Sequence, residues 1–244
     1  FVPLGNALGK FTGSFNGLGN TINDLSINRS NADLIGLFGS VDGATISNVG
    51  LINANITGRG QVGSLIGQMK NGLLLNAYSK SAQVTGLGEA GGLVGQLTVD
   101  AANAVTLKNN FFDGTITGTS GGSIGGGIGL IFSANNTYGD MLVQNNFANV
   151  TITSASSNVG GFIGNVALYG AANVNVFDNF SKGSVSSTAD GVGGFVGSTD
   201  LNACALGCKP VGKLNIARNY SNVVVSGNDG VGGFGGSLWN GYSD

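Results

Sequence analysis

Aspartates are the side chains with which this chain could carry out acid–base chemistry, because its sequence contains no histidine. Histidine is the commonest general base and the commonest metal ligand, so its absence weakens both kinds of site. Asp190 and Asp229 each open the phrase Asp-Gly-Val-Gly-Gly-Phe, whereas Asp113 and Asp178 are scattered. On adjacent coils, two carboxyl groups could lie about 5 Å apart, as in retaining glycosidases. A catalytic pair should bring further titratable neighbours, so we favour turn aspartates that precede glycine.

The two cysteines, Cys204 and Cys208, lie four residues apart in Cys-Ala-Leu-Gly-Cys. We predict a disulfide between them, which suits an exported protein. A metal site with two thiolates is the alternative, but it would lack further cysteine or histidine ligands. The glycine-rich stretches lack the Lys-Ser/Thr ending of a phosphate-binding loop. The sequence therefore predicts no catalytic residue, no metal site and no cofactor.

A three-residue pattern recurs along the chain: a residue that is polar in most copies, then Ile or Val, then Thr or Ser. The recurring residues are Thr57, Thr85, Thr117, Thr153, Ser186 and Ser226. This alternation predicts strands with the β-branched residue inward and the hydroxyl outward. The column is the candidate contact surface. A flat Thr-x-Thr array would also suit ice binding, but Asn55, Gln83 and Val224 interrupt the second column, so we favour ordinary solvent-facing residues over that reading.

Composition narrows the class of protein. Of the 244 residues, 46 are glycine and 2 are proline, and 41% are hydrophobic, so the chain can bury a core and does not resemble a disordered linker. Charged residues make up 9% and the net charge is −2, which argues against nucleic-acid binding. No apolar run reaches the roughly 20 residues that a membrane span needs. Because the chain begins at Phe1, we expect it to be part of a larger parent protein.

A short glycine phrase recurs seven times, and its closing glycines stand 28 to 39 residues apart. Its pattern is Gly-(Gly/Ser)-(Leu/Phe)-(Ile/Val)-Gly, with clear copies at 63–67, 91–95, 160–164 and 193–197 and degenerate copies that end at Gly39, Gly129 and Gly236. A period of this length predicts stacked units. We expect the closing glycine to mark a corner that needs positive φ or close backbone approach.

Each repeat also contains an asparagine followed by an aromatic residue. The pairs are Asn110-Phe111, Asn146-Phe147, Asn179-Phe180 and Asn219-Tyr220, and Tyr78 and Leu51 are expected to take the aromatic position in earlier repeats. With three strands per repeat and coils about 4.8 Å apart, these residues predict an internal aromatic stack and an inward amide ladder. The copies with glycine in place of a core residue, at Gly127 and Gly235, are expected to pack least well.

The glycine phrase resembles the GLUG motif of large, repetitive secreted or surface proteins of bacteria. The stretch from Phe11 to Ile22 is similar to the segment that precedes such repeats in filamentous-haemagglutinin-like exoproteins. The resemblance covers about residues 1 to 239 and implies a right-handed parallel β-helix, an all-β solenoid of about seven coils. We expect a lead-in or first coil over 1–30, solenoid repeats over 31–239 and the start of a following segment over 240–244.

The resemblance also implies a function outside the cell. We expect a non-catalytic section of an extracellular or cell-surface adhesin or filament. Its partners would be a host or neighbouring-cell surface, with glycans among the candidate ligands, or other copies of itself. A purely structural stalk is the alternative, and a carbohydrate-active enzyme or an ice-binding solenoid is less favoured.

Overall fold

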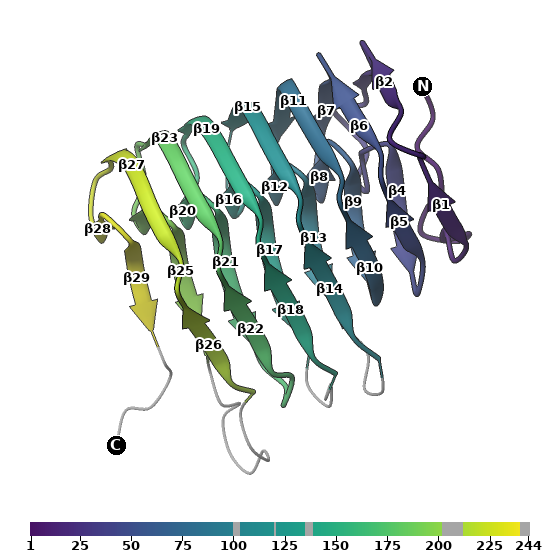
Figure 1. The fold of residues 1–244 in the computed structure, drawn as a ribbon. Helices are drawn as coiled ribbons and strands as arrows, with labels where there is room; N and C mark the ends of the chain where they lie inside the picture. The colour runs from purple at the N-terminus through teal and green to yellow at the C-terminus, as the bar shows by residue number, and fades with distance from the viewer. Residues whose placement is uncertain (100–102, 120, 135–138, 202–211, 240–244) are drawn as a thin grey trace.

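The computed structural model describes residues 1–99, 103–119, 121–134, 139–201 and 212–239, and in these residues it contains strands and turns but no helix. The strands stack along one axis, with the first coil at one end of the rod and the last coil at the other (Figure 1). Every strand pair is parallel. The parallel β-solenoid expected from the repeat is confirmed.

Four sheets run along the rod, which we number in the order in which the chain visits them. Sheet 1 contains β1 (Ser14–Asn16), β5 (Thr45–Ser47), β10 (Gly72–Leu75), β14 (Val105–Lys108), β18 (Met141–Gln144), β22 (Val174–Phe177) and β26 (Leu214–Ala217). Sheet 2 contains β2 (Thr21–Asn23), β3 (Ser26–Asn28), β6 (Gly50–Ile52), β7 (Asn55–Gly58), β11 (Tyr78–Gly86), β15 (Phe111–Gly118), β19 (Phe147–Ser154), β23 (Phe180–Ser187) and β27 (Tyr220–Ser226).

The glycine phrase supplies the two remaining sheets. Sheet 3 contains β8 (Val62–Gly63), β12 (Ala90–Gly91), β16 (Ile124–Gly125), β20 (Val159–Gly160), β24 (Val192–Gly193) and β28 (Val231–Gly232). Sheet 4 contains β4 (Phe38–Asp42), β9 (Ile66–Lys70), β13 (Val94–Thr98), β17 (Ile128–Ser133), β21 (Ile163–Leu168), β25 (Val196–Asp200) and β29 (Gly235–Trp239). A complete coil thus has four strands rather than three, because the phrase spans two strands with a bend between them.

The lead-in segment belongs to the same stack. Leu4 pairs with Phe38 and Phe11 pairs with Val41, both in parallel, so these two residues add a partial rung to sheet 4. The rings of Phe11 and Phe15 pack on Phe38, with centroids 5.0 and 5.4 Å away. The first coil therefore begins within the lead-in.

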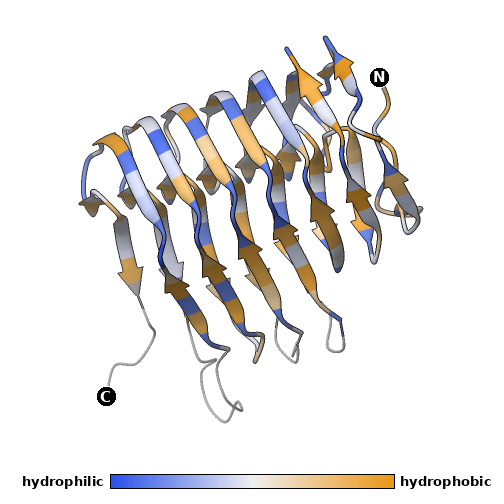
Figure 2. Ribbon diagram, viewed as in Figure 1, coloured by the Kyte–Doolittle hydropathy of each residue, from blue (hydrophilic) through white to orange (hydrophobic). Residues whose placement is uncertain are grey.

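The core consists of columns of apolar side chains that run the length of the rod. One such column lies on the inward side of sheet 2. Along each strand of that sheet, hydrophobic residues alternate with hydrophilic ones (Figure 2). Its members are Ile27, Ile56, Val84, Ile116, Ile152, Val185 and Val225. Each strand turns every second side chain inward, and equivalent positions of successive coils carry similar apolar residues. Together these two features account for the continuous core.

The asparagine ladder is confirmed, and it is buried. The side-chain NH2 group of Asn110 donates to the side-chain oxygen (Oδ1) of Asn146 at 2.9 Å. Asn146 donates in the same way to Asn179, and Asn179 to Asn219, each at 2.9 Å. Each of these Oδ1 atoms also accepts a hydrogen bond from the backbone N–H of the ladder asparagine on the preceding coil. Positive φ falls one residue earlier, for example at Asn145 (φ 54°), so the ladder residues serve as hydrogen-bonding groups and not as left-handed corners.

The predicted aromatic stack exists, but the prediction that it is internal was wrong. Phe111, Phe147, Phe180 and Tyr220 stack with centroids 5.0–5.2 Å apart and interplanar angles of 12–17°, and their side chains are half-buried or exposed on the outward face of sheet 2. The asparagine before each ring points inward, and alternation then turns the ring outward. The inward aromatic stack is a different one, in the glycine phrase, formed by Phe162, Phe195 and Phe234.

Two further expectations need correction. Tyr78 lies opposite Gly50, so Gly50 and not Leu51 takes the aromatic position in that coil. The repeat around Gly127 is not loosely packed, because the Phe162 ring of the next coil occupies the space, 2.8 Å from where a Cβ at Gly127 would lie. A large side chain one coil away thus replaces the missing one.

The closing glycines are needed for close approach and not for positive φ. A Cβ on Gly95 would clash with the backbone nitrogen of Val62 and would lie 2.6 Å from the carbonyl carbon of Gln61 and 2.7 Å from the Gly67 oxygen. Gly95 does not have a positive φ. Backbone from sheets 3 and 4 meets here without room for a side chain.

The buried amide ladder should be a major source of stability. We expect Asn146→Ala to lower the free energy of unfolding by about 3 kcal/mol, because it leaves buried donors and acceptors on both neighbouring coils without partners. Denaturant-induced unfolding followed by circular dichroism measures this loss. Asn222→Ala, on the exposed face, should change stability by less than about 0.5 kcal/mol. Equal losses in the two variants would contradict a stabilising role for the ladder.

The close backbone approach at the closing glycine gives a second test. Gly95→Ala should lower the free energy of unfolding by more than about 2 kcal/mol. The added methyl group meets backbone that cannot move without breaking hydrogen bonds between strands of adjacent coils. Gly233→Ala is the matched control, since nothing lies within 4 Å of a Cβ at that position. Thermal unfolding of both variants should show a lowered midpoint for Gly95→Ala alone.

Candidate contact surface

The predicted hydroxyl column is present and in register. Thr57, Thr85, Thr117, Thr153, Ser186 and Ser226 are direct partners on successive strands of sheet 2. The first two are half-buried and the other four are exposed. We call this outward surface of β7, β11, β15, β19, β23 and β27 the hydroxyl face. Parallel pairing spaces its hydroxyl groups about 4.8 Å apart along the rod.

A second column lies two residues earlier on the same face. Thr115 and Thr151 are direct partners and Ser184 follows, while Gln83 precedes them and Val224 ends the column. Thr115 and Thr151 are exposed. The central three coils therefore carry paired hydroxyl columns, separated by the inward column of the core.

The outward aromatic stack borders the hydroxyl face at the start of β15, β19, β23 and β27. Because the rings lie face to face along the rod, each covers its neighbour's face and presents its edge to solvent. A sugar ring packs against an aromatic face, so the inner rings offer no stacking platform. The contact chemistry of this surface is therefore that of hydroxyl and amide groups beside apolar ring edges.

The aspartates that the sequence singled out have structural partners. Asp190 accepts a hydrogen bond from the side chain of Asn228 at 2.8 Å, and Asp229 accepts one from the backbone of Gly230 at 2.7 Å. Asp113 accepts one from Asn149 at 2.5 Å. Asp190 and Asp229 lie in bends directly before a glycine, as interpreted from the sequence, whereas Asp113 lies within β15. The described residues contain no group of three side chains able to hold a metal ion.

Asp178 forms the clearest ion pair of this set. Arg218 donates to both of its carboxylate oxygens, at 2.6 and 2.9 Å, and Gln144 on the other side donates at 3.1 Å. The hydrogen bonds from Arg218 are the main reason why the pKa of Asp178 lies below its ordinary value. A carboxylate held ionised in this way, between two coils, is unsuited to general acid chemistry.

Cys204 and Cys208 lie outside the described residues, so their predicted disulfide remains a prediction. The same holds for the expected segment at 240–244. Within the described part of the chain, no helix is long and apolar enough to cross a membrane.

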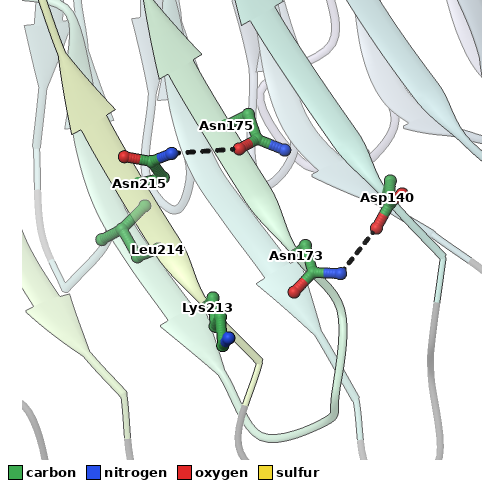
Figure 3. A pocket seen from close by; sticks show the side chains of 6 residues that line it. All are labelled: Asp140, Asn173, Asn175, Lys213, Leu214 and Asn215. Atoms are coloured by element: carbon green, nitrogen blue, oxygen red, sulfur yellow. Dashed lines mark hydrogen bonds between the residues drawn. The ribbon is translucent and has the colours of Figure 1, made fainter.

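An open hollow of about 470 Å³ lies at the start of β22 and β26 in sheet 1 (Figure 3). It is lined by Asp140, Asn173, Asn175, Lys213, Leu214 and Asn215. Asn173 donates to Asp140 at 2.9 Å, and Asn215 donates to Asn175 at 3.5 Å. Both hydrogen bonds join neighbouring coils, so the arrangement resembles the other surface ladders more than an active site.

This hollow was not predicted from the sequence. Asn175 and Asn215 each stand between two inward apolar residues, in Val-Asn-Val and Leu-Asn-Ile, and that pattern alone would have placed them outward on neighbouring strands. What the pattern could not supply is the position of Lys213 and Asp140, which precede their strands.

Part of this chain is similar to halomucin. No family model matches the sequence. Over 80 residues the chain is 49% identical to halomucin from Haloquadratum walsbyi (strain DSM 16790 / HBSQ001), and the matched stretch covers 31% of this chain and 1% of halomucin. The chain thus corresponds to a very small part of that protein, so any activity or partner of the whole protein remains a proposal here.

Tyr169 and Asp200 form a half-buried pair at the end of sheet 4. The Tyr169 hydroxyl donates to Asp200 at 2.6 Å, and its ring packs edge-on against Phe132, with centroids 5.9 Å apart. The hydrogen bond to Asp200, followed by burial, raises the pKa of Tyr169 to about 12. Folding therefore favours the neutral phenol, as expected for a hydroxyl beside a carboxylate.

This shift predicts a loss of stability at alkaline pH. The contribution of the pair is complete below about pH 10, the ordinary tyrosine value, and is lost as the pH rises towards about 12. Ultraviolet titration of phenolate formation should show a late transition that disappears in Tyr169→Phe. In Asp200→Asn the transition should move back towards about 10, because the hydrogen bond to the carboxylate, which is the main cause of the raised pKa, is gone. A titration unchanged in Tyr169→Phe would assign the transition to another tyrosine.

Proposed function

We propose that this chain is a non-catalytic section of a secreted or cell-surface protein and that its hydroxyl face mediates attachment or self-association. The observation that carries the proposal is the column of six hydroxyl residues in register on the outward side of sheet 2. A regular row of small polar groups suits a partner that is itself regular, such as a polysaccharide or another β-sheet surface.

The chemistry of the face favours many weak contacts. Each exposed Thr or Ser supplies one donor and one acceptor, and successive coils repeat the same groups. A polymer bound along the rod would gain affinity through repetition, because each further contact forms at a high effective concentration. The six residues of the hydroxyl column carry no charge, so contacts made by that column should depend little on salt.

A location outside the cell is part of the same proposal. The partial similarity to halomucin and the resemblance to GLUG repeats both agree with a repetitive extracellular or surface protein. The partners that we propose are the surface of a host or neighbouring cell, with glycans among the ligands, or other copies of the chain.

A structural stalk is the second candidate function, and the unbroken ladders favour it. Apolar, amide and aromatic columns link successive coils through most of the rod. Such a rod would be stiff and could project another domain without binding anything itself. The two functions differ in whether the hydroxyl face itself makes contacts.

A binding assay with a face-specific variant separates the two. The purified chain would be tested on immobilised neutral, uronic and sulfated polysaccharides and on washed cells. We expect Thr117→Lys combined with Thr153→Lys to reduce binding about tenfold or more, because two long charged side chains then stand in the centre of the face. Thr45→Lys with Thr106→Lys places two lysines on sheet 1, at half-buried positions on either side of the coil that carries Leu73, and should leave binding unchanged.

Other results would count against the attachment role. If both double variants bind as the unmodified chain does, the hydroxyl face is not the contact surface. If none of these probes is bound, and monovalent antibody fragments that coat the face leave the attachment of producing cells unchanged, the stalk function is favoured.

A further inference from the structure

Three polar side chains from successive rungs of the rod meet at the end of sheet 4. Lys10 lies beside the lead-in rung, Asp42 ends β4, and Asn71 directly follows β9. The Nζ atom of Lys10 donates to Oδ2 of Asp42 at 3.2 Å. The Nδ2 atom of Asn71 donates to Oδ1 of the same carboxylate at 2.9 Å. One carboxylate therefore holds an amine on one oxygen and a carboxamide on the other.

The register of sheet 4 produces this arrangement. The backbone N–H of Asp42 donates to the Phe11 oxygen at 3.0 Å, which fixes the carboxylate beside the lead-in rung. On the other side, Asp42 is the direct strand partner of Lys70, so Asn71 stands one residue beyond it. The positive φ of Asn71 (58°) turns the chain there as β9 ends. The carboxylate thus lies on the rung between those of the amine and the carboxamide.

The carboxamide of this trio is protected from other nucleophiles. Asn71 is 4% exposed, whereas the side chains of Lys10 and Asp42 are 31% and 27% exposed. Water, the ordinary competitor, therefore has little access to the side chain of Asn71. In an Asn-Gly sequence the glycine nitrogen can also attack the asparagine side chain, but the N–H of Gly72 donates to the Ala104 oxygen at 2.9 Å. Burial and this hydrogen bond restrain both competing reactions.

We propose that Lys10 and Asn71 join through an amide bond between their side chains, with Asp42 as the catalytic group. Asp42 takes a proton from the Lys10 ammonium, and the neutral amine attacks Cγ of Asn71. The Nζ–Cγ bond forms and the Cγ–Nδ2 bond breaks. The amine nitrogen gives up two protons in all, and Asp42 passes them to Nδ2, which leaves as an ammonium ion. No atom changes its oxidation state, and no co-reactant is needed.

Proximity is the main contribution of the fold to this reaction. Because both nitrogen groups are held by one carboxylate, the attack becomes a step within one preassembled site. The carboxylate is also placed to accept the proton from one nitrogen and to deliver it to the other. After the reaction, the new amide N–H can still donate to Asp42. The step happens once in each chain, so it is compatible with a section that turns over no substrate.

The cross-link would strengthen the attachment of the lead-in rung. This rung pairs with β4 through isolated bridges at Leu4 and Phe11, whereas β4 and β9 pair along most of their length. A bond from Lys10 to Asn71 would tie the rung to β9 across the intervening coil. Like any cross-link between distant residues, it would also restrict the unfolded chain. This role is independent of contacts made by the hydroxyl face.

Mass spectrometry of the denatured whole chain tests the proposal directly. The cross-linked chain should weigh about 17 Da less than its sequence, because one ammonia is lost. Trypsin should then release a branched peptide that joins residues 1–29 to residues 71–80, since trypsin does not cut after an acylated lysine. Neither measurement depends on the folding of a variant.

Three variants test the assigned roles. Lys10→Arg keeps a positive charge beside Asp42, but a guanidinium does not lose its proton to become a nucleophile, so this variant should have its full sequence mass. Asp42→Asn should also have its full mass, because it removes the group that transfers the protons. Lys70→Arg is the matched control and should keep the loss of mass, since Lys70 is the strand partner of Asp42 but not the attacking amine.

Three results would overturn the proposal. The first is an unmodified chain that has its full sequence mass and yields no joined peptide. The second is a loss of mass that persists in Lys10→Arg or that hydroxylamine reverses, because it would come from a cyclic imide. The third is a cross-link that forms as readily in Asp42→Asn, which would remove the catalytic role of that carboxylate. Circular dichroism should show all three variants folded.

Discussion

Parallel pairing in register is the constraint on which the rest of this structure depends. Each strand lies on its equivalent one coil away, so a side chain at one position meets the side chain of the same position above and below. A residue type that interacts well with itself can therefore fill a whole column. Phenylalanine stacks on phenylalanine and valine packs on isoleucine, and asparagine is both donor and acceptor in the buried ladder.

The same constraint explains why so much glycine occurs in an ordered chain. At the bend between sheets 3 and 4, the backbone of one coil passes within contact distance of the backbone of the next, as at Gly95 and Gly164. A Cβ has no place there, and the requirement returns with every coil. The glycine content therefore reflects repeated close approach, and it is compatible with a rigid core.

Features that repeat in every coil could be predicted from the sequence. Packing in which a side chain of one coil fills a space left in another could not. The period, the β-branched inward column, the hydroxyl column and the amide ladder could all be identified from spacing and alternation. The side of the sheet on which Phe111 and Phe147 lie could not, because a run such as Asn-Phe-Phe fits either phase. Gly127 shows the other limit, since its space is filled by Phe162 from the next repeat, and no pattern within a single repeat contains that information.

The outward columns differ from the core in what keeps the residue type similar from coil to coil. Inside the rod, packing requires similar residues on each coil, but solvent makes no such demand on the outside. The same strands of sheet 2 carry another outward column in which lysine, aspartate and asparagine alternate, at Lys80, Asp113, Asn149, Lys182 and Asn222. Strand propensity favours threonine in both columns equally, yet only the Thr57 column keeps a hydroxyl on six successive coils. Since neither packing nor propensity accounts for this difference, it is the reason for placing the proposed contact on that column and not on the one beside it.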